Sequence, residues 1–545
     1  MVLALNSLHC FPSVRFLTLG LALGERNTLP LEKLTAHANS YASARGLQVE
    51  KRTGDGSSLY ECAPMSLLPN AYPKEAFCRA QSLAMPFNLL VDRISRDGNF
   101  LVNTLGGGVA DADPFTGKLL KLYKKIYMED QDTFARSADL LGILRSDYML
   151  NFKGQGQPLE LKQVELNTIA ASFAGLAVNV AALHRHLISR FRSDVHDFIC
   201  VNKGVISGSA DAELSDDDGV PENPALLFIP EAMNVAHERY KSRFPDSDPV
   251  ILFVVQEGET NTVDQRMLEF RLWEAHGIPV VRMSLTRAQT DLHVDPSTGA
   301  VHITTGGGRE EVSVVYFRSG YAPTDYPDGY EGIEWEARER IERSRATKCP
   351  SLGYHLAGTK KVQQELARSG CLERFFPDVN EAPIVTDIRN VFAGLYSLGE
   401  DTAPEDLEAV NDAINGSEGR YVLKPQREGG GYNFYGNQLA VKLKENIERA
   451  PSSDDIKLGK GLAEFILMER LFPPQQQAVL LRSGRVQGSG ASISELGCFG
   501  TLVVSSAGVV VHNKYAGFLL RTKFSNVDEG GVASGFATLS SPFLC

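Results

Sequence analysis

The chain has 545 residues, 43% of them hydrophobic and 22% charged, which is the composition of a globular protein long enough for two or more packed units. Its formal net charge is −12, and an acidic surface repels nucleic acid and anionic membranes. No stretch reaches the ~20 apolar residues of a membrane span, so we expect neither nucleic acid nor a membrane as a partner.

The N-terminal segment, residues 1–29, is predicted to be an extension of the folded protein. Its first 24 residues carry Arg15, no acidic residue and an apolar run at Leu17–Leu23, which fits either a targeting peptide or an upstream start. The eight cysteines are scattered without a C-x-x-C pair, which indicates reduced thiols. We therefore expect a cytoplasmic protein, or one that residues 1–29 direct to an organelle.

Helical periodicity dominates residues 30–145, as in Cys78–Ile94 and Leu119–Leu144. The glycines at Gly106–Gly108 interrupt this pattern and predict a loop between two helices. This part of the chain is therefore expected to be mainly helical.

The next predicted strand, Leu161–Asn167, carries potential metal-ligating side chains on one face. Alternation with period two puts Glu165 and Asn167 on the same face. Carboxylate and amide oxygens two residues apart suit a hard cation such as Mg²⁺. An ordinary half-exposed strand fits the same pattern.

Residues 250–283 predict a β-α-β unit. Apolar strands at Val250–Val255 and Ile278–Met283 flank a helix at Thr262–Glu274, so the strands should be parallel. Thr262 and Gln265 fit a helix capping box, and a ligand contact by Gln265 is the alternative.

The strongest local motif is Tyr421–Gly431, in which a strand ends in Lys424, followed by Glu428 and the glycines Gly429–Gly431. Glycines allow close backbone approach to a polyphosphate, while the lysine supplies charge and the carboxylate a ligand for Mg²⁺. The glycine spacings of the Walker and dinucleotide motifs are absent, and a plain turn also fits.

A second cationic motif lies near the C-terminus. Arg521 and Lys523 stand two residues apart on a predicted strand, followed by a small-residue loop at 529–535. This arrangement suits anion binding, although a solvated edge strand would carry the same residues.

Several stretches together resemble the eukaryotic glutathione synthetase family, ligases with the ATP-grasp fold. The motifs that carry the resemblance are Phe87–Asp92, Arg145–Met149, Glu165–Ile169, Phe317–Tyr321, Ser351–Leu366, Lys424–Gly431, Ser494–Gly497 and Leu520–Gly535. The resemblance implies ligation of glycine to γ-glutamylcysteine through an acyl phosphate, with ATP as co-substrate, two Mg²⁺ ions and a homodimer. No protein nucleophile is required, because positioning and charge neutralisation carry such chemistry.

The resemblance also assigns residues. Arg521 and Arg145 are the expected catalytic residues, and Glu165, Asn167 and Glu428 the expected Mg²⁺ ligands. Nucleotide contacts are expected from Glu165, Lys360, Lys424, Glu428, Gly429, Gly430, Gly431, Asn433, Tyr435, Met468, Glu469, Leu471, Glu495, Lys523 and Glu529. Substrate contacts are expected from Arg145, Ser172, Glu259, Asn261, Gln265, Arg318, Tyr321, Arg521, Val532 and Ala533.

The expected architecture is α/β: an ATP-grasp domain at 30–249 and 362–545, interrupted by a parallel α/β substrate-binding domain at 250–361 and closed by a glycine-rich lid. The small pair Ala533-Ser534 favours glycine as the acceptor, because bulkier residues there admit β-alanine in relatives that make homoglutathione. The alternatives are a ligase for β-alanine or serine, and a nucleotide-binding paralogue without activity.

Overall fold

The computed structural model describes residues 29–154, 157–209, 212–399, 402–426, 432–449, 456–532 and 534–545. The predicted extension, apart from residue 29, lies outside these ranges. So do the predicted site residues Glu428, Gly429, Gly430, Gly431 and Ala533. Among the described residues, no helix is long and apolar enough to cross a membrane.

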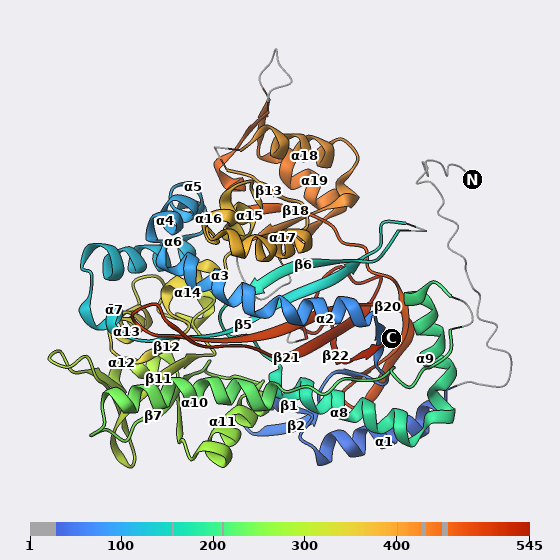
Figure 1. The fold of residues 1–545 in the computed structure, drawn as a ribbon, viewed down its shortest axis with the longest axis horizontal. Coiled ribbons are helices and arrows are strands. Elements are labelled where there is room, and N and C mark those ends of the chain that lie inside the picture. Colours follow the sequence, from blue (N-terminus) through green and yellow to red (C-terminus); the bar gives the residue numbers. More distant parts are fainter. Residues whose placement is uncertain are drawn as a thin grey trace.

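A large mixed sheet dominates the fold and confirms the α/β class (Figure 1). Its main path runs β19 (Gln476–Arg482), β3 (Met65–Ser66), β22 (Thr538–Ser540), β21 (Val510–Phe524), β20 (Arg485–Val504), β5 (Leu140–Asn151), β12 (Thr347–Cys349), β11 (Gly308–Phe317), β10 (Val301–Thr305) and β9 (Leu292–Val294). Beside this path, β6 (Glu160–Asn167) pairs with β5, and β7 (Val250–Val254) pairs with β11 and β8 (Val280–Met283).

The central strands are apolar because helices cover them. Helices α3 (Ala84–Arg96) and α10 (Ala225–Arg243) both pack against β20 and β21. In Figure 1, α2 (Lys74–Ser82) and α3 run above these strands, whereas α8 (Ala174–Arg190) and α10 run below them. The alternative interpretation of the Arg521 strand as a solvated edge strand is wrong, since β21 lies between β20 and β22.

The predicted β-α-β unit is confirmed. Helix α11 (Thr262–His276) connects β7 to β8, and the two strands pair in parallel. The capping box is wrong, because the N-cap residue is Asn261 and no side chain caps the helix. Thr262 Oγ1 instead donates to Glu50 Oε2 at 2.6 Å.

A smaller lobe stands above the large sheet in Figure 1. Its sheet has the order β13 (Leu395–Ser397), β18 (Phe465–Glu469), β14 (Tyr421–Pro425) and β15 (Phe434–Tyr435). Helices α18 (Pro404–Ile414) and α19 (Gly436–Glu445) bury a separate apolar cluster against it, which includes Leu423, Leu439 and Leu467. The predicted strand at Tyr421–Pro425 is confirmed, and it brings Lys424 to the side of the lobe that faces β6, where Lys424 Nζ donates to Val164 O at 3.3 Å.

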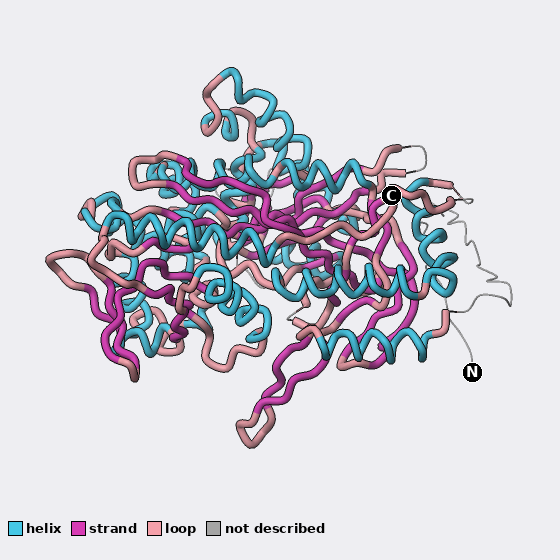
Figure 2. The backbone as a smooth tube through the Cα atoms, turned by 60° about the horizontal axis from the view of Figure 1, so that its bottom comes forward, coloured by secondary structure: helices cyan, strands magenta, loops and turns pink. Residues whose placement is uncertain are grey.

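The N-terminal part is less helical than predicted. Residues 140–144 begin β5, because their apolar side chains pair with β20 inside the sheet instead of continuing a helix. A hairpin of β1 (Gln48–Arg52) and β2 (Ser58–Cys62) also interrupts the helices and projects from the body in Figure 2. Gly106–Gly108 does join two helices, α4 (Gly98–Leu105) and α5 (Gly108–Ala112), as predicted.

The other helices are short or peripheral. Their bounds are α1 (Leu31–Ala44), α6 (Pro114–Tyr123), a π-helix (Lys124–Glu129), α7 (Thr133–Ser137), α9 (Arg192–Ser207), α12 (Leu285–Asp291), α13 (Ile333–Glu342), α14 (Leu352–Ala357), α15 (Lys360–Ala367), α16 (Cys371–Arg374) and α17 (Ala382–Val391). The remaining paired strands are β4 (Asn70–Tyr72) with β23 (Pro542–Leu544), and β16 (Ile447–Arg449) with β17 (Ile456–Leu458).

Candidate active site

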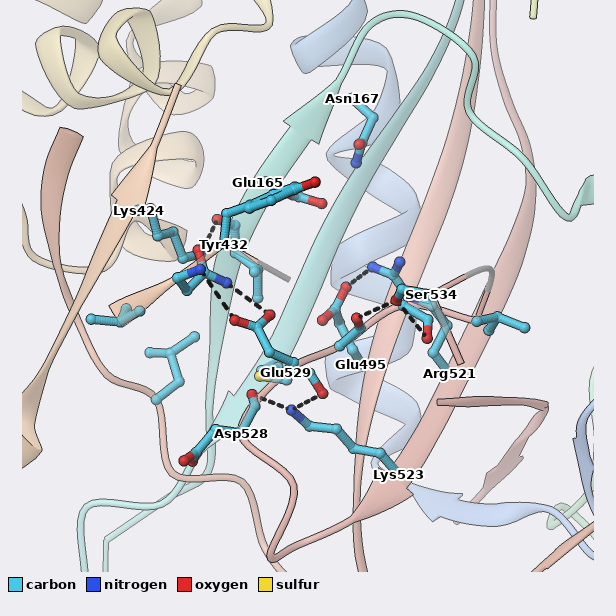
Figure 3. A pocket seen from close by; sticks show the side chains of 18 of the residues that line it. Glu165, Asn167, Lys424, Tyr432, Glu495, Arg521, Lys523, Asp528, Glu529 and Ser534 are labelled. Carbon is cyan, nitrogen blue, oxygen red and sulfur yellow. Dashed lines mark hydrogen bonds and ion pairs between the residues drawn. The ribbon is translucent and has the colours of Figure 1, made fainter. Parts of the chain in front are cut away.

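A cavity of about 320 Å³ lies where the large sheet meets the smaller lobe (Figure 3). Its walls come from β5, β6, β14, β18, β20, β21 and the segment around Val532. The predicted site residues that line it are Arg145, Glu165, Asn167, Ser172, Tyr321, Lys360, Lys424, Asn433, Tyr435, Met468, Glu469, Leu471, Glu495, Arg521, Lys523, Glu529 and Val532. Sequence segments far apart in the chain thus meet at one site.

Glu165 and Asn167 project from β6 into this cavity, as the alternation of the strand predicts. Glu165 Oε2 lies 3.5 Å from Lys360 Nζ. Burial would raise the pKa of Glu165, but Lys360, Lys424 and the nearby arginines lower it to about 2. The carboxylate is therefore ionised at neutral pH, as a Mg²⁺ ligand must be.

Arg145 and Arg521 converge on the buried carboxylate of Asp147. Arg145 Nε and Nη2 donate to its two oxygens at 2.7 and 2.8 Å, and Arg521 Nη2 donates to Oδ2 at 2.9 Å. Asn167 Nδ2 donates to the same Oδ2 at 3.0 Å. Asp147 therefore orients two predicted catalytic residues and one predicted metal ligand, although the sequence analysis gave it no role.

The sheet register explains how these groups come so close. Asp147 on β5 pairs with Glu165 on β6 and with Gly497 on β20, while Glu495 on β20 pairs with Arg521 on β21. A Cβ atom at Gly497 would lie 2.6 Å from Asp147 Oδ1, so only glycine leaves room for the Arg145–Asp147 pair.

Glu495 is the second carboxylate beside Arg521, whose Nη2 donates to Glu495 Oε1. Burial raises the pKa of Glu495, and the charges of Asp147 and Glu165 raise it further, while Arg521 opposes both effects. The pKa of Arg521 is raised because these carboxylates outweigh its own burial. Arg521 is thus held as a cation at the centre of three acids.

A separate network shapes the other end of the cavity. Lys523 Nζ donates to the carbonyls of Asp528 and Glu529 at 2.6 and 2.9 Å. The Glu529 carboxylate accepts from Asn433 N at 3.1 Å and from Asn433 Nδ2 at 3.2 Å. These contacts tie the segment before Val532 to the smaller lobe, next to Tyr435.

Arg470 also belongs to this end, although the sequence analysis missed it. Its Nη2 donates to Asp528 Oδ1 at 2.7 Å, and its guanidinium lies 5.3 Å from the centre of the Tyr435 ring. Its position directly after Met468-Glu469, at the end of β18, is the signal that could have found it.

Four predicted substrate residues, Glu259, Asn261, Gln265 and Arg318, do not line this cavity. They form a cluster in which the Asn261 N–H donates to Glu259 and Arg318 lies close to the charge of Glu259. Gln265 Nε2 donates to Glu259 Oε2 at 2.6 Å, so Gln265 is buried in a side-chain network. Arg318 is buried, and its Nε and Nη1 lack hydrogen-bond partners within the described part of the chain, as does Asn261 Oδ1. Unpaired buried polar atoms are costly, so this cluster has donors and an acceptor available for a polar ligand.

Two carboxylates hold the loops between the cavity and this cluster. Asp264 accepts from the backbone N–H groups of Phe173, Gly175 and Leu176 at 2.8, 2.8 and 3.2 Å. It thereby anchors a loop in which Ala170 and Phe173 adopt left-handed backbone angles, φ 50° and 70°. Such angles persist for non-glycine residues only where surrounding contacts enforce them.

Asp325 does the same for the turn that carries Tyr321. Its Oδ2 accepts from the backbone N–H groups of Gly320, Tyr321 and Ala322 at 2.8, 3.0 and 3.2 Å. Gln256 Nε2 joins Asp325 Oδ1 to the Tyr321 hydroxyl, at 2.7 and 3.1 Å. Neither Asp264 nor Asp325 could be recognised from the sequence, because most of their partners are backbone amides.

Fold and site together define a class of protein, an α/β enzyme whose cation-lined cavity suits a nucleotide polyphosphate next to a carboxylate–amide pair. The family model of the eukaryotic glutathione synthase ATP-binding domain matches residues 29–544. The chloroplastic glutathione synthetase of Solanum lycopersicum is 38% identical over 519 residues, which cover 94% of this chain and 84% of that one. The human enzyme is 37% identical over 518 residues, 94% of this chain and 97% of that one.

This chain therefore belongs to the eukaryotic glutathione synthase family and is an enzyme of the ATP-dependent ligase class. The glutathione synthetase of Dictyostelium discoideum is 37% identical, covering 88% of this chain and 91% of its own. A solved structure, the apo form of a glutathione synthetase-like effector from Globodera pallida, has a TM-score of 0.67 at 22% identity, covering 94% and 97% of the two chains, and supports the fold.

Proposed function

We propose that the enzyme joins γ-glutamylcysteine and glycine to form glutathione, with conversion of ATP to ADP and phosphate. The cysteinyl carboxylate takes the γ-phosphoryl group of ATP, the glycine amine attacks the acyl phosphate, and phosphate leaves. The observation that carries this proposal is the gathering of Lys360, Lys424, Arg521 and Lys523 around one cavity in a chain of net charge −12. Such a cavity attracts polyanions despite the acidic surface.

The chain's own residues would orient the reactants and neutralise charge. Lys424 and Lys360 face the place where phosphates would lie beside Glu165. Arg521 is fixed by Asp147 and Glu495, so it would stabilise charge on the reacting carboxyl without reorganising. The buried cluster of Arg318, Asn261 and Gln265 would hold the γ-glutamyl end of the peptide.

Mg²⁺ fits the oxygen ligands that the described residues offer. Glu165 is ionised and Asn167 faces the same cavity, and Glu428 would complete the protein ligands. The described residues include no group of three His, Cys, Asp or Glu side chains that could hold a metal ion by themselves, so water and phosphate oxygens would have to complete the coordination. Bound there, Mg²⁺ would neutralise phosphate charge.

The proposed architecture is the ATP-grasp fold, with its two parts at 30–249 and 362–545, an inserted substrate-binding domain at 250–361 and a lid formed by the glycine-rich segments. In support, β14 and β18 form one wall of the cavity while β6 and β21 form the other, as expected if the two lobes grip a nucleotide.

We also propose a homodimer that forms through the β1–β2 hairpin and α11, which pack against each other. Leu59, Tyr60, Phe270 and Trp273 are 59%, 54%, 55% and 62% exposed, an unusual density of exposed apolar side chains. The substitution Trp273→Glu should convert the dimer into a monomer, as measured by light scattering, whereas a monomeric wild-type protein would contradict the proposal.

We propose either a cytoplasmic or an organellar location for the enzyme, because two plant relatives are named chloroplastic.

The test of the function is phosphate release from ATP and Mg²⁺ with γ-glutamylcysteine, in parallel with glycine, β-alanine, serine and no acceptor. Release that needs both substrates and yields mainly the glycine tripeptide by mass is expected. A preference for β-alanine or serine would change the proposed acceptor substrate but leave the proposed mechanism unchanged. Tight ATP binding without release for any acceptor would favour a non-catalytic paralogue.

A further inference from the structure

A second, larger cavity of about 1310 Å³ lies outside the active site. Its walls come from α4–α6 and the π-helix on one side and from α15, α16 and β13 on the other, and we name it the α6–α15 groove. Figure 1 shows α4–α6 beside α15 and α16, below the smaller lobe. It shares no lining residue with the first cavity.

The α6–α15 groove carries an excess of positive charge. Its lining includes the cations Lys121, Lys124, Lys125, Lys361, Arg368 and Arg374, against the acids Glu129 and Glu365. This imbalance is the opposite of the chain's overall charge of −12. The groove is more than a cluster of exposed lysines, because it also contains the half-buried ammonium group of Lys361.

Some of these cations are already neutralised. Lys125 pairs with Glu339 at 2.7 Å, Arg368 with Glu365 at 3.3 Å, and Arg374 with Asp97. Lys121, Lys124 and Lys361 have no carboxylate within ion-pair distance among the residues that the structure describes. Three lysines in one groove therefore make no ion pair with a described carboxylate.

For Lys361 the missing ion pair is unfavourable, because its ammonium group is half-buried. Its Nζ donates at 2.6 Å to Gln364 Oε1 and at 2.6 Å to Ser397 Oγ, both neutral acceptors. Burial lowers the pKa of Lys361 to about 8, and the neighbouring carboxylates of Glu365 and Asp406 do not compensate. A bound anion would supply the missing charge.

The first turn of α15 joins this groove to the active site. Lys360 faces the active-site cavity and its neighbour Lys361 faces the groove. The backbone N–H of Lys361 also donates to Gln426 Oε1 at 2.8 Å, and Gln426 lies directly after β14, two residues beyond Lys424. A ligand on Lys361 would thus contact the same turn that presents Lys360 to the nucleotide.

We propose that the α6–α15 groove is a second anion site, which binds a small phosphate-bearing anion through Lys121, Lys124 and Lys361. Lysine ammonium groups bind phosphate oxygens as point charges, whereas planar carboxylate recognition typically uses arginine. The two arginines of the groove are already engaged by Glu365 and Asp97. The site is separate from the ligase reaction and does not depend on its substrate.

The test is calorimetric titration of the full chain with inorganic pyrophosphate, after the active site has been saturated with Mg²⁺ and a non-hydrolysable ATP analogue. We expect saturable binding of one pyrophosphate per chain, weakened at least tenfold in Lys121→Glu/Lys124→Glu. The matched control is Lys74→Glu/Lys444→Glu, which makes the same charge change at exposed lysines outside the groove and should bind as the wild type does. Lys361→Gln should weaken binding while keeping both hydrogen-bonding neighbours.

Three results would overturn the proposal: no saturable binding to the wild type, equal weakening in both double variants, or unchanged affinity in Lys121→Glu/Lys124→Glu. Thermal unfolding of each variant shows whether it is folded. Because Lys121 is exposed and Lys124 half-buried, their replacement should leave the fold intact.

Discussion

Replacement of Arg521 by alanine should abolish most turnover while the protein stays folded. Arg521 would be the cation that stabilises charge on the reacting carboxyl, and loss of one preorganised donor of this kind lowers kcat by about 10²–10³-fold. Arg521→Lys keeps the positive charge but loses the planar fork of the guanidinium group, so it should recover activity only in part.

The cost in stability can be bounded from the same contacts. Stranding a buried charge costs about 3–5 kcal/mol, but Asp147 keeps both hydrogen bonds from Arg145 at 2.7 and 2.8 Å. Glu495 already has a raised pKa and can take up a proton once Arg521 is gone. We therefore expect the free energy of unfolding to fall by only about 1–3 kcal/mol.

The assay is phosphate release that depends on γ-glutamylcysteine and glycine, with urea unfolding of the same preparations. Arg420→Ala is the matched control, because Arg420 is exposed, pairs with Asp412 and lies outside the cavity. If Arg521→Ala kept more than about a tenth of the wild-type kcat, the charge-stabilising role would be refuted. Loss of cooperative unfolding would instead assign Arg521 a structural role.

Three further predictions follow from other contacts of the site. Asp325→Ala removes the acceptor of three backbone N–H groups, so KM for γ-glutamylcysteine should rise about tenfold (~1.4 kcal/mol) while kcat changes little; a fall in kcat alone would contradict this. Asn167→Ala should raise the Mg²⁺ concentration for half-maximal activity by roughly 10–100-fold, and an unchanged Mg²⁺ titration would exclude Asn167 as a ligand. The pKa of Glu165 is lowered from 4.5 to about 2, so its stabilising contribution is present above about pH 4.5 and is lost as the pH falls toward 2. The stability difference between wild type and Glu165→Gln should therefore be larger at about pH 6 than at about pH 3, as measured by urea unfolding.

Local pattern predicted much of this site. Period-two alternation put Glu165 and Asn167 on one face of a strand, and both line the cavity. The strand that carries Lys424, Tyr421–Pro425, was predicted to the residue, because three apolar and β-forming residues precede Lys424 and a proline ends the run. The helix at Thr262 was also predicted correctly, but the predicted capping box is wrong, since the Thr262 hydroxyl donates to Glu50 of the distant hairpin.

Tertiary contacts decided what local pattern could not. The apolar residues 140–144 suit a helix or a strand equally well, and only pairing with β20 makes them a strand. Asp147, Asp264 and Asp325 look like ordinary acids in the sequence. Their roles come mostly from partners distant in the sequence: Arg521 is 374 residues from Asp147, and Phe173 is 91 residues from Asp264. Asp325 instead accepts from backbone amides within its own turn.

By itself the sequence determined the α/β class, the family and the identity of most groups that meet in the cavity, because side-chain chemistry and short-range periodicity are written in neighbouring residues. The tertiary structure alone decided how these groups are charged and oriented. Charges brought close by long-range pairing lower the pKa of Glu165 and raise that of Arg521 against the effect of burial, whereas burial raises the pKa of Glu495. The fold also directs Lys360 and Lys361 toward two different cavities. Such effects depend on which charges lie within a few ångströms in space, and separation along the chain does not report that distance.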